Sequence, residues 1–281
     1  MDENELVCYK KFNRGKLLKL IVIPQKLRHS IISDVHNSVY KGCHSGVART
    51  YAKLSNFYFW PNLYRDIKNY VQTCHACQVA KKSKIRYGKI TPSFEKDNRI
   101  FYQINSDMVG PFKYGGRDIY VLTAICNFSK FLIMRAYYKV SAETVIAFLD
   151  EIISIFPCPR IFKTDNGSIF ENNKVRAYCE AMGITLRHSL KYSPSTNAIV
   201  ERCHQNLSSG LKTLIEGLKT HEIFRTIRMI MRVYNTTPSR QLDGYSPCAI
   251  VFSEEDRWLE LKYDIPTPNI AVKSERKKSK R

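Results

Sequence analysis

The sequence predicts an α/β domain with a mixed sheet, preceded by a small helical domain. Apolar residues recur at helical spacings of three and four over residues 26–80. From residue 100, runs of β-branched and aromatic residues predict strands. After residue 141, helical and strand patterns alternate. Strands followed by alternating helices and strands are typical of a sheet packed against helices.

The chain begins with a predicted hairpin extension over residues 1–25, whose turn is Asn13-Arg14-Gly15 and whose second apolar run ends at Pro24. Three amphipathic helices follow over 26–80, the third starting at Trp60-Pro61 with the proline in its first position. Their apolar faces carry Leu27, Ile31 and Val35, then Val47, Tyr51 and Leu54, then Leu63, Ile67 and Val71. Residues 81–99 are polar and basic and are expected to form a linker.

Residues 100–254 are predicted to form the α/β domain. Strands are expected over 100–109, 118–127, 130–138, 161–164 and 184–187, with Gly115-Gly116 as one turn. Ser141 is expected to cap a helix with one apolar stripe, which Pro157 and Pro159 end. Further helices are expected over 171–182, 199–218 and 221–234, with a polar loop over 188–198 and a basic tail over 255–281.

The composition is that of a globular protein, since 44% of the 281 residues are hydrophobic. No run of about 18 apolar residues exists, so no membrane partner is expected, and the N-terminus lacks the pattern of a secretory signal. The nine cysteines are an odd number, and only Cys74 and Cys77 lie close together. A secreted disulfide framework would differ, so we expect a reducing, intracellular environment.

The net charge of +20 favours a polyanion as partner. Phosphate contacts by lysine and arginine release counterions and give an affinity that does not depend on base sequence. A well-solvated basic surface is the simpler interpretation, but an excess of this size favours nucleic-acid binding.

Two histidines and a cysteine pair suggest a metal site in the first domain. Seven residues separate His36 from His44, and Cys74 and Cys77 form a C-x2-C pair 29 residues after His44. Zinc favours four nitrogen and sulfur ligands in a tetrahedron. A region of about 55 residues has a small core, so a bound metal would add folding free energy that it needs.

Three neighbouring residues remain alternative ligands. Cys43 and His75 each adjoin a proposed ligand in the sequence, and His29 lies a turn or two earlier on the first helix. Spacing alone does not choose among these sets.

Three acidic residues suggest a second metal site. Asp107 and Asp165 each end a predicted strand, and Glu201 follows Asp165 after 35 intervening residues. Two Mg²⁺ ions can stabilise both the attacking and the leaving oxygen of phosphodiester displacement, and Mg²⁺ prefers carboxylate ligands. Taken singly, each acid has an ordinary interpretation as a turn former or a residue favoured in a first helical turn. The set of three is what indicates catalysis.

The combined motifs resemble a known family. The segments Gly42-Cys43-His44-Ser45-Gly46, Trp60-Pro61 and Cys74-His75-Ala76-Cys77-Gln78, with His36, resemble the His-His-Cys-Cys domain of Ty3/gypsy-type and retroviral integrases. Residues 100–251 resemble the RNase H-like integrase core, a mixed five-stranded sheet with helices, and Tyr234-Asn235-Thr236-Thr237-Pro238 is similar to its closing helix. The hairpin resembles the extension that precedes the zinc domain in gypsy-type enzymes.

The resemblance implies a DDE polynucleotidyl transferase that carries out 3′-end processing and strand transfer of DNA. It places Asp107, Asp165 and Glu201 on the catalytic triad, with two Mg²⁺ or Mn²⁺ ions per site. It also implies one structural Zn²⁺ held by His36, His44, Cys74 and Cys77. The expected partners are element ends, target DNA and further copies of the chain in a dimer or tetramer.

Two other interpretations stay open at this point. The chain starts at Met1 and ends near residue 281 without room for a sizeable C-terminal domain, which favours a domesticated or truncated integrase-like nucleic-acid-binding protein without integration activity. Ala198 also stands where relatives often carry glycine, and Thr164 where serine is more usual. An RNase H-type nuclease would share the fold and the metals but would leave the His-His-Cys-Cys motif unexplained.

Basic residues and one tyrosine are expected to contact DNA phosphates, which positions DNA without reading its sequence. They are Lys81, Lys82, Lys84, Arg86 and Lys89 in the linker, Arg187, His188, Lys191 and Tyr192 beside the active-site loop, and Arg202, His204 and Lys212 on the following helix. The basic run over 273–281 suggests a nuclear-localisation signal or a DNA-binding tail. We therefore expect the protein in the nucleus, and in the cytoplasm before nuclear entry.

Overall fold

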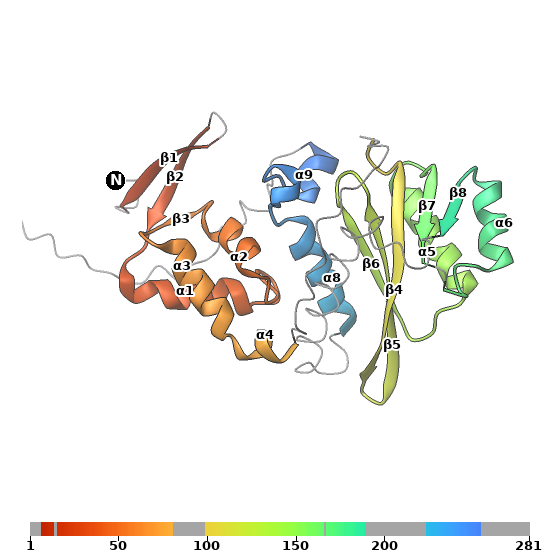
Figure 1. Ribbon diagram of the computed structural model, residues 1–281, viewed down its shortest axis with the longest axis horizontal. Helices are drawn as coiled ribbons and strands as arrows, with labels where there is room; N and C mark the ends of the chain where they lie inside the picture. Colours follow the sequence, from red (N-terminus) through yellow and green to blue (C-terminus); the bar gives the residue numbers. More distant parts are fainter. Residues whose placement is uncertain (1–6, 14–15, 81–98, 166, 189–222, 254–281) are drawn as a thin grey trace, which may run out of the picture.

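The computed structural model describes residues 7–13, 16–80, 99–165, 167–188 and 223–253. Within these ranges, a small helical domain with a three-stranded sheet lies beside a larger domain built on a five-stranded sheet (Figure 1). None of the helices in these ranges combines the length and the apolar character that a membrane span requires.

The described part of the small domain combines a hairpin with short helices. Its elements are β1 (Cys8–Asn13), β2 (Lys16–Val22), α1 (Gln25–Asn37), α2 (Val47–Leu54), β3 (Tyr58–Phe59), α3 (Leu63–Thr73) and α4 (His75–Ala80). The expected hairpin is confirmed, since β1 and β2 pair antiparallel, and β2 also pairs with β3 in parallel. The third helix starts at Leu63 rather than at Pro61, because Asn62 takes a left-handed conformation at the N-cap.

The larger domain carries the predicted mixed sheet. Its elements are β4 (Gln103–Tyr114), β5 (Arg117–Cys126), β6 (Leu132–Tyr137), α5 (Ala142–Ile155), β7 (Ile161–Thr164), α6 (Asn173–Ala181), β8 (Thr185–His188), α8 (Ile223–Asn235), the 3-10 helix η1 (Arg240–Leu242) and α9 (Pro247–Phe252). The strand order is β6-β5-β4-β7-β8. Strands β4, β5 and β6 pair antiparallel, whereas β4, β7 and β8 pair in parallel.

Both faces of this sheet are covered by helices (Figure 1). Along β5, Val121 and Ile125 pack into the apolar cluster that contains α8, while Leu122 and Ala124 pack into the cluster that contains α5 and α6. Successive side chains of a strand point to opposite faces, so a strand buried on both sides reads as a continuous apolar run. This explains why β5 lacks the alternation of polar and apolar residues.

Strand β4 is longer than the sequence predicts. The expected strand ends at Val109, before Gly110-Pro111, but β4 continues to Tyr114. Its register with β5 shifts between Val109 and Phe112, and Pro111 lies inside this irregularity. A proline has no N–H to donate, and a bulge is one of the few places where a strand accommodates it. The loop and helix predicted over 188–198 and 199–218 fall almost entirely outside the described residues.

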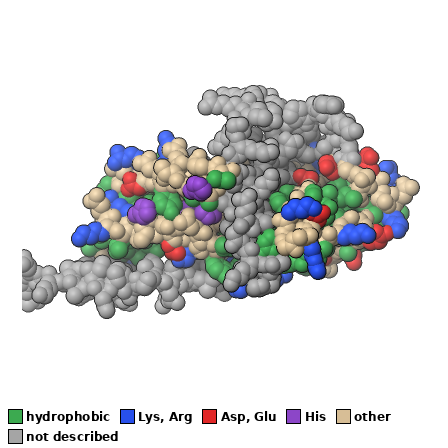
Figure 2. Space-filling model, turned by 90° about the horizontal axis from the view of Figure 1, so that it is seen from below, with side chains coloured by type: hydrophobic (Ala, Val, Ile, Leu, Met, Phe, Trp, Pro, Cys, Tyr) green, Lys and Arg blue, Asp and Glu red, His purple; other side chains and the backbone are tan. Residues whose placement is uncertain are grey.

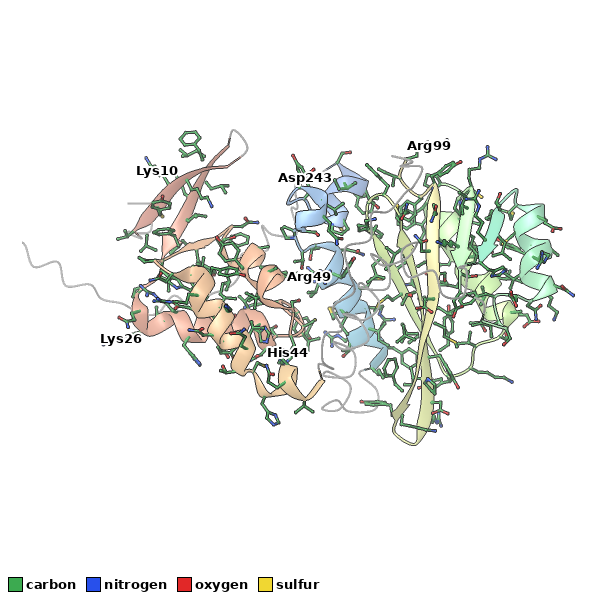
Figure 3. The ribbon with its side chains drawn as sticks, in the orientation of Figure 1. Lys10, Lys26, His44, Arg49, Arg99 and Asp243 are labelled. Atoms are coloured by element: carbon green, nitrogen blue, oxygen red, sulfur yellow. The ribbon has the colours of Figure 1, made fainter. Side chains whose placement is uncertain are left out.

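The turn between α1 and α2 packs the small domain against the larger one. Cys43 in this turn is buried and belongs to the same apolar cluster as Ile223 of α8. The Arg49 guanidinium lies 4.4 Å from the centre of the Tyr234 ring, a cation–π contact between α2 and α8. Figure 3 shows His44 and Arg49 on the side of the small domain that faces α8.

Asn235, the last residue of α8, completes the hydrogen bonding of strand β6. Its Oδ1 accepts a hydrogen bond from the Leu132 N–H at 2.8 Å, and its Nδ2 donates to the Leu132 carbonyl at 2.7 Å. Strand β6 is an edge strand, yet Leu132 is fully buried. The Asn235 amide therefore acts as a substitute for the missing neighbouring strand at this residue.

We expect Asn235→Ala to lower the free energy of unfolding by about 2 to 4 kcal/mol, because it leaves one donor and one acceptor of Leu132 buried without partners. Urea unfolding of the full chain measures this change. Asn173→Ala, at an exposed position in the first turn of α6, is the matched control and should stay within about 0.5 kcal/mol of the parent. Equal effects of the two substitutions would contradict the bridging role of Asn235.

Candidate metal centre and active site

Four side chains of the small domain meet at one point. His36 lies in the last turn of α1, His44 lies in the turn before α2, Cys74 follows α3 and Cys77 lies in α4. One nitrogen or sulfur atom from each lies within 4.8 Å of all the others. His36 and Cys77 are buried, and His44 and Cys74 are half-buried. The structure thus brings together the four residues that the sequence singles out.

The distances among these atoms suit a tetrahedral zinc ion. Cys77 Sγ lies 3.4 Å from His36 Nε2 and 3.8 Å from His44 Nδ1, and Cys74 Sγ lies 3.5 Å from His44 Nδ1. With Zn–S near 2.3 Å and Zn–N near 2.0–2.1 Å, a tetrahedron places sulfur and nitrogen ligands about 3.6 Å apart. The donor set and its spacing therefore fit Zn²⁺.

A tight turn sets the two histidines in place. The His44 N–H donates to the His36 carbonyl at 2.9 Å, which ties one ligand residue to the other. Gly42 makes this possible, because a Cβ atom at that position would lie 1.9 Å from the Val35 carbonyl oxygen. No other residue can bring the chain this close to the end of α1.

The alternative ligands are directed elsewhere. The Cys43 thiol donates to the Val39 carbonyl, and burial raises its pKa to about 12, whereas a zinc ligand must be a thiolate. His75 is exposed, and His29 packs edge-on against the Tyr70 ring. Figure 2 shows histidine side chains grouped on the half of the molecule that holds the small domain. Of the candidates weighed from the sequence, His36, His44, Cys74 and Cys77 form the cluster.

Asp107 and Asp165 belong to neighbouring strands of the larger domain. Asp107 lies inside β4 and not at a strand end as the sequence predicts, because β4 continues to Tyr114, whereas Asp165 directly follows the end of β7. Asn105 of β4 is paired with Lys163 of β7 in parallel register. Asp107 and Asp165 each follow two residues later, so their side chains share one face of the sheet. Adjacent strands lie about 4.8 Å apart, so this register, continued for two residues beyond the last pair, would bring the two acids to neighbouring positions.

Backbone groups orient both carboxylates. The Met108 N–H donates to Asp107 Oδ1 at 2.8 Å, and the Gly167 N–H donates to Asp165 Oδ1 at 3.1 Å. A Cβ atom at Gly167 would lie 3.0 Å from Asp165 Oδ1, a tight contact that would require the carboxylate to shift by a few tenths of an ångström. Gly167 therefore supports the position of Asp165 through both its N–H group and its lack of a side chain.

Of the other predicted site residues, the structure describes only Arg187 and His188. Arg187 of β8 is exposed, and it is paired with Lys163, on the face that carries Asp165. His188 belongs to the opposite face, where its Nδ1 lies 3.1 Å from Thr164 Oγ1. Outside the described residues lie Glu201, Lys81, Lys82, Lys84, Arg86, Lys89, Lys191, Tyr192, Arg202, His204 and Lys212.

Two family models match the chain in the order of its domains. The integrase zinc binding domain matches residues 23–83, and the integrase core domain matches residues 97–194. The first match spans all four residues of the zinc cluster, and the second spans both aspartates.

Relatives of the chain are Pol polyproteins of mobile elements and viruses. The Retrovirus-related Pol polyprotein from transposon 412 of Drosophila melanogaster is 29% identical over 231 residues, which cover 81% of this chain and 18% of that protein. The Transposon Tf2-3 polyprotein of Schizosaccharomyces pombe is 26% identical over 242 residues, with 81% and 18% covered. The chain thus spans about a fifth of the length of these relatives.

Among solved structures, the chain is similar to a simian T-cell lymphotropic virus intasome in complex with the PP2A regulatory subunit B56 gamma. The TM-score is 0.51 at 16% identity, and the match covers 76% of this chain and 72% of that one. This similarity concerns the fold. The matched models and relatives give the chain an integrase zinc-binding domain followed by an integrase core domain, and its relatives are retrotransposon and retroviral Pol polyproteins.

Proposed function

We propose that this chain catalyses metal-dependent 3′-end processing and strand transfer of DNA, with Asp107, Asp165 and Glu201 as its metal-binding acids. The parallel pairing of β4 with β7, from which we infer that Asp107 within β4 and Asp165 after β7 share one face, carries the proposal. The match to the integrase core domain, a member of the polynucleotidyl transferase superfamily, supports the same chemistry. Glu201 lies outside the described residues, and its role rests on the family resemblance and on its spacing from Asp165.

The two carboxylates suit hard divalent cations such as Mg²⁺ or Mn²⁺. Two such ions, when bound, stabilise both the attacking and the leaving oxygen of an in-line phosphoryl displacement. The Met108 and Gly167 N–H groups hold one oxygen of each carboxylate in place. Because the carboxylates are already held in place, ion binding loses less conformational entropy in ordering the two acids.

DNA is the proposed substrate and partner. Exposed Arg187, on the same face as Asp165, is suited to contact a phosphate of the bound strand. The net charge of +20 adds a general attraction for nucleic acid. We also propose that the chain works as a dimer or tetramer, since the solved structure that it resembles is described as an intasome. Its proposed place is the nucleus, which the basic run over 273–281 favours.

We propose one structural Zn²⁺ in the small domain, held by His36 Nε2, His44 Nδ1 and the thiolates of Cys74 and Cys77. These ligands come from both ends of the domain's sequence. A metal that joins them contributes its binding free energy to folding.

For the zinc site, we expect Cys74→Ser to abolish stoichiometric zinc, because zinc binding requires all four ligands. Metal analysis of the purified chain should give about one zinc per wild-type chain. His75→Ala is the matched control, since this exposed neighbour lies outside the cluster. Full zinc content in the Cys74→Ser protein would contradict the proposed ligand set.

For the acids, we expect Asp107→Asn and Asp165→Asn each to lower Mn²⁺-dependent nicking and joining of DNA by more than about 100-fold. The loss of a metal ligand should reduce the rate by more than the 10- to 100-fold that is typical for the loss of a residue that only orients a metal ligand. Nicking of a supercoiled plasmid measures the chemistry without knowledge of the element ends. Glu171→Gln, at an exposed acid on the turn after β7, should leave the rate unchanged. Wild-type rates in both aspartate variants would refute the assignment.

For Gly167, we expect Ala to lower the nicking rate by about 10-fold while the chain stays folded, because the added methyl group presses on Asp165 Oδ1. Gly46→Ala adds the same group where nothing lies within 4 Å, and it serves as the control. Plasmid nicking and thermal melting are measured together. A rate equal to that of the wild type would show that the carboxylate tolerates the displacement.

A further inference from the structure

A histidine and a threonine converge on the backbone of Asp165. His188 ends β8 and is paired with Thr164 of β7. His188 Nδ1 lies 3.1 Å from Thr164 Oγ1 and 3.3 Å from the Asp165 carbonyl oxygen. The Thr164 hydroxyl donates to the same carbonyl at 3.0 Å. Three polar groups therefore meet where β7 leaves the sheet.

The acceptor chemistry decides how the protons are arranged. A carbonyl oxygen can only accept, so its contact with Nδ1 requires the His188 proton to be on that nitrogen. The Thr164 hydroxyl can then accept from Nδ1 while it donates to the Asp165 carbonyl. The Asp165 carbonyl thus accepts directly from two donors: the Thr164 hydroxyl and the His188 Nδ1–H, which it shares with that hydroxyl.

The pairing of the strands keeps His188 away from any ion that Asp165 binds. Thr164 precedes Asp165, so its side chain lies on the opposite face of the sheet, and His188 is paired with Thr164 on that face. Thr164 is buried, and its contact with half-buried His188 is partly buried. His188 can therefore reach Asp165 only through the backbone.

We propose that His188 is a positioning residue, which together with Thr164 clamps the Asp165 carbonyl and thereby fixes the direction of the Asp165 carboxylate. This inference rests on the proposed function, because it assigns the carboxylate a metal to bind. Gly167 holds the carboxylate of Asp165 from the far side of the turn. The clamp holds its backbone from the sheet side, so both ends of the residue are restrained.

Because the proposed contact uses only Nδ1 of His188, amide side chains that place an N–H at the Nδ1 or the Nε2 position can test it. Asparagine carries an N–H donor near the place of Nδ1, whereas glutamine carries it near the place of Nε2. We expect His188→Gln to weaken Mn²⁺ binding by about 10- to 100-fold, the usual cost of losing a group that orients a metal ligand. His188→Asn should recover most of that loss. Thr164→Ser keeps the hydroxyl and should bind as the parent does, whereas Thr164→Val should follow His188→Gln.

The measurement is Mn²⁺ binding to the full, zinc-loaded chain by electron paramagnetic resonance at one fixed pH, with thermal melting of every variant. Binding that survives in Asp165→Asn is subtracted as belonging to other sites. The plasmid-nicking rate is recorded in parallel. A contact that serves only the fold would lower the melting temperature in step with affinity and would show no difference between asparagine and glutamine.

Loss of affinity in His188→Gln with recovery in His188→Asn, at similar melting temperatures, supports the clamp even if the wild-type chain nicks no DNA. Absence of nicking by the wild type counts against the proposed function alone. Equal affinities in His188→Gln and His188→Asn would overturn the inference, and so would a wild-type chain whose Mn²⁺ binding does not depend on Asp165.

Discussion

The parallel pairing of β4 with β7 is the constraint on which the candidate active site depends. It sets Asn105 opposite Lys163. This register, continued for two residues, would bring Asp107 and Asp165 to neighbouring positions on one face. A slip of one residue would place Asp165 on the opposite face from Asp107. Parallel strands cannot be joined by a tight turn, so the chain needs β5, β6 and α5 as the connection between them. Much of the larger domain therefore serves to bring two short segments together.

Apolar packing holds that register in place. Ile104 and Phe162 are paired across the two strands, and both are fully buried in the cluster formed with α5 and α6. Alternation along the strands then directs Asp107 and Asp165 to the other face. The chemistry of the site thus depends on the burial of residues that carry no functional group. A polar residue in place of Ile104 or Phe162 would be buried at a cost in free energy, and this would weaken the strand register that the apolar packing stabilises.

The sequence predicts local features of this protein better than long-range ones. The strand that leads to Asp165 has the predicted bounds, because the proline and Asp-Asn-Gly signals on either side of it are local. The extension of β4 through Pro111 could not be predicted, since its pairing with β5 beyond the register shift decides it. Spacing also leaves Cys43 open as a ligand, and only the fold shows its thiol turned toward Val39. Asn235 belongs to a recognisable motif, but its partner Leu132 lies about a hundred residues away.

The turn that carries the zinc ligands also fixes the place of the small domain. His36 and His44 bracket this turn, and its Cys43 side chain enters the apolar cluster of α8. The backbone of this turn must therefore place His36 and His44 for the metal and, at the same time, direct Cys43 into the apolar cluster of α8. Only glycine at position 42 allows it to approach α1 closely enough for both. Helix α8 in turn holds edge strand β6 through its last residue, so packing runs without interruption from the zinc ligands to the sheet that carries Asp107. Because one backbone meets both demands, the geometry of the metal ligands also sets where the small domain docks on α8.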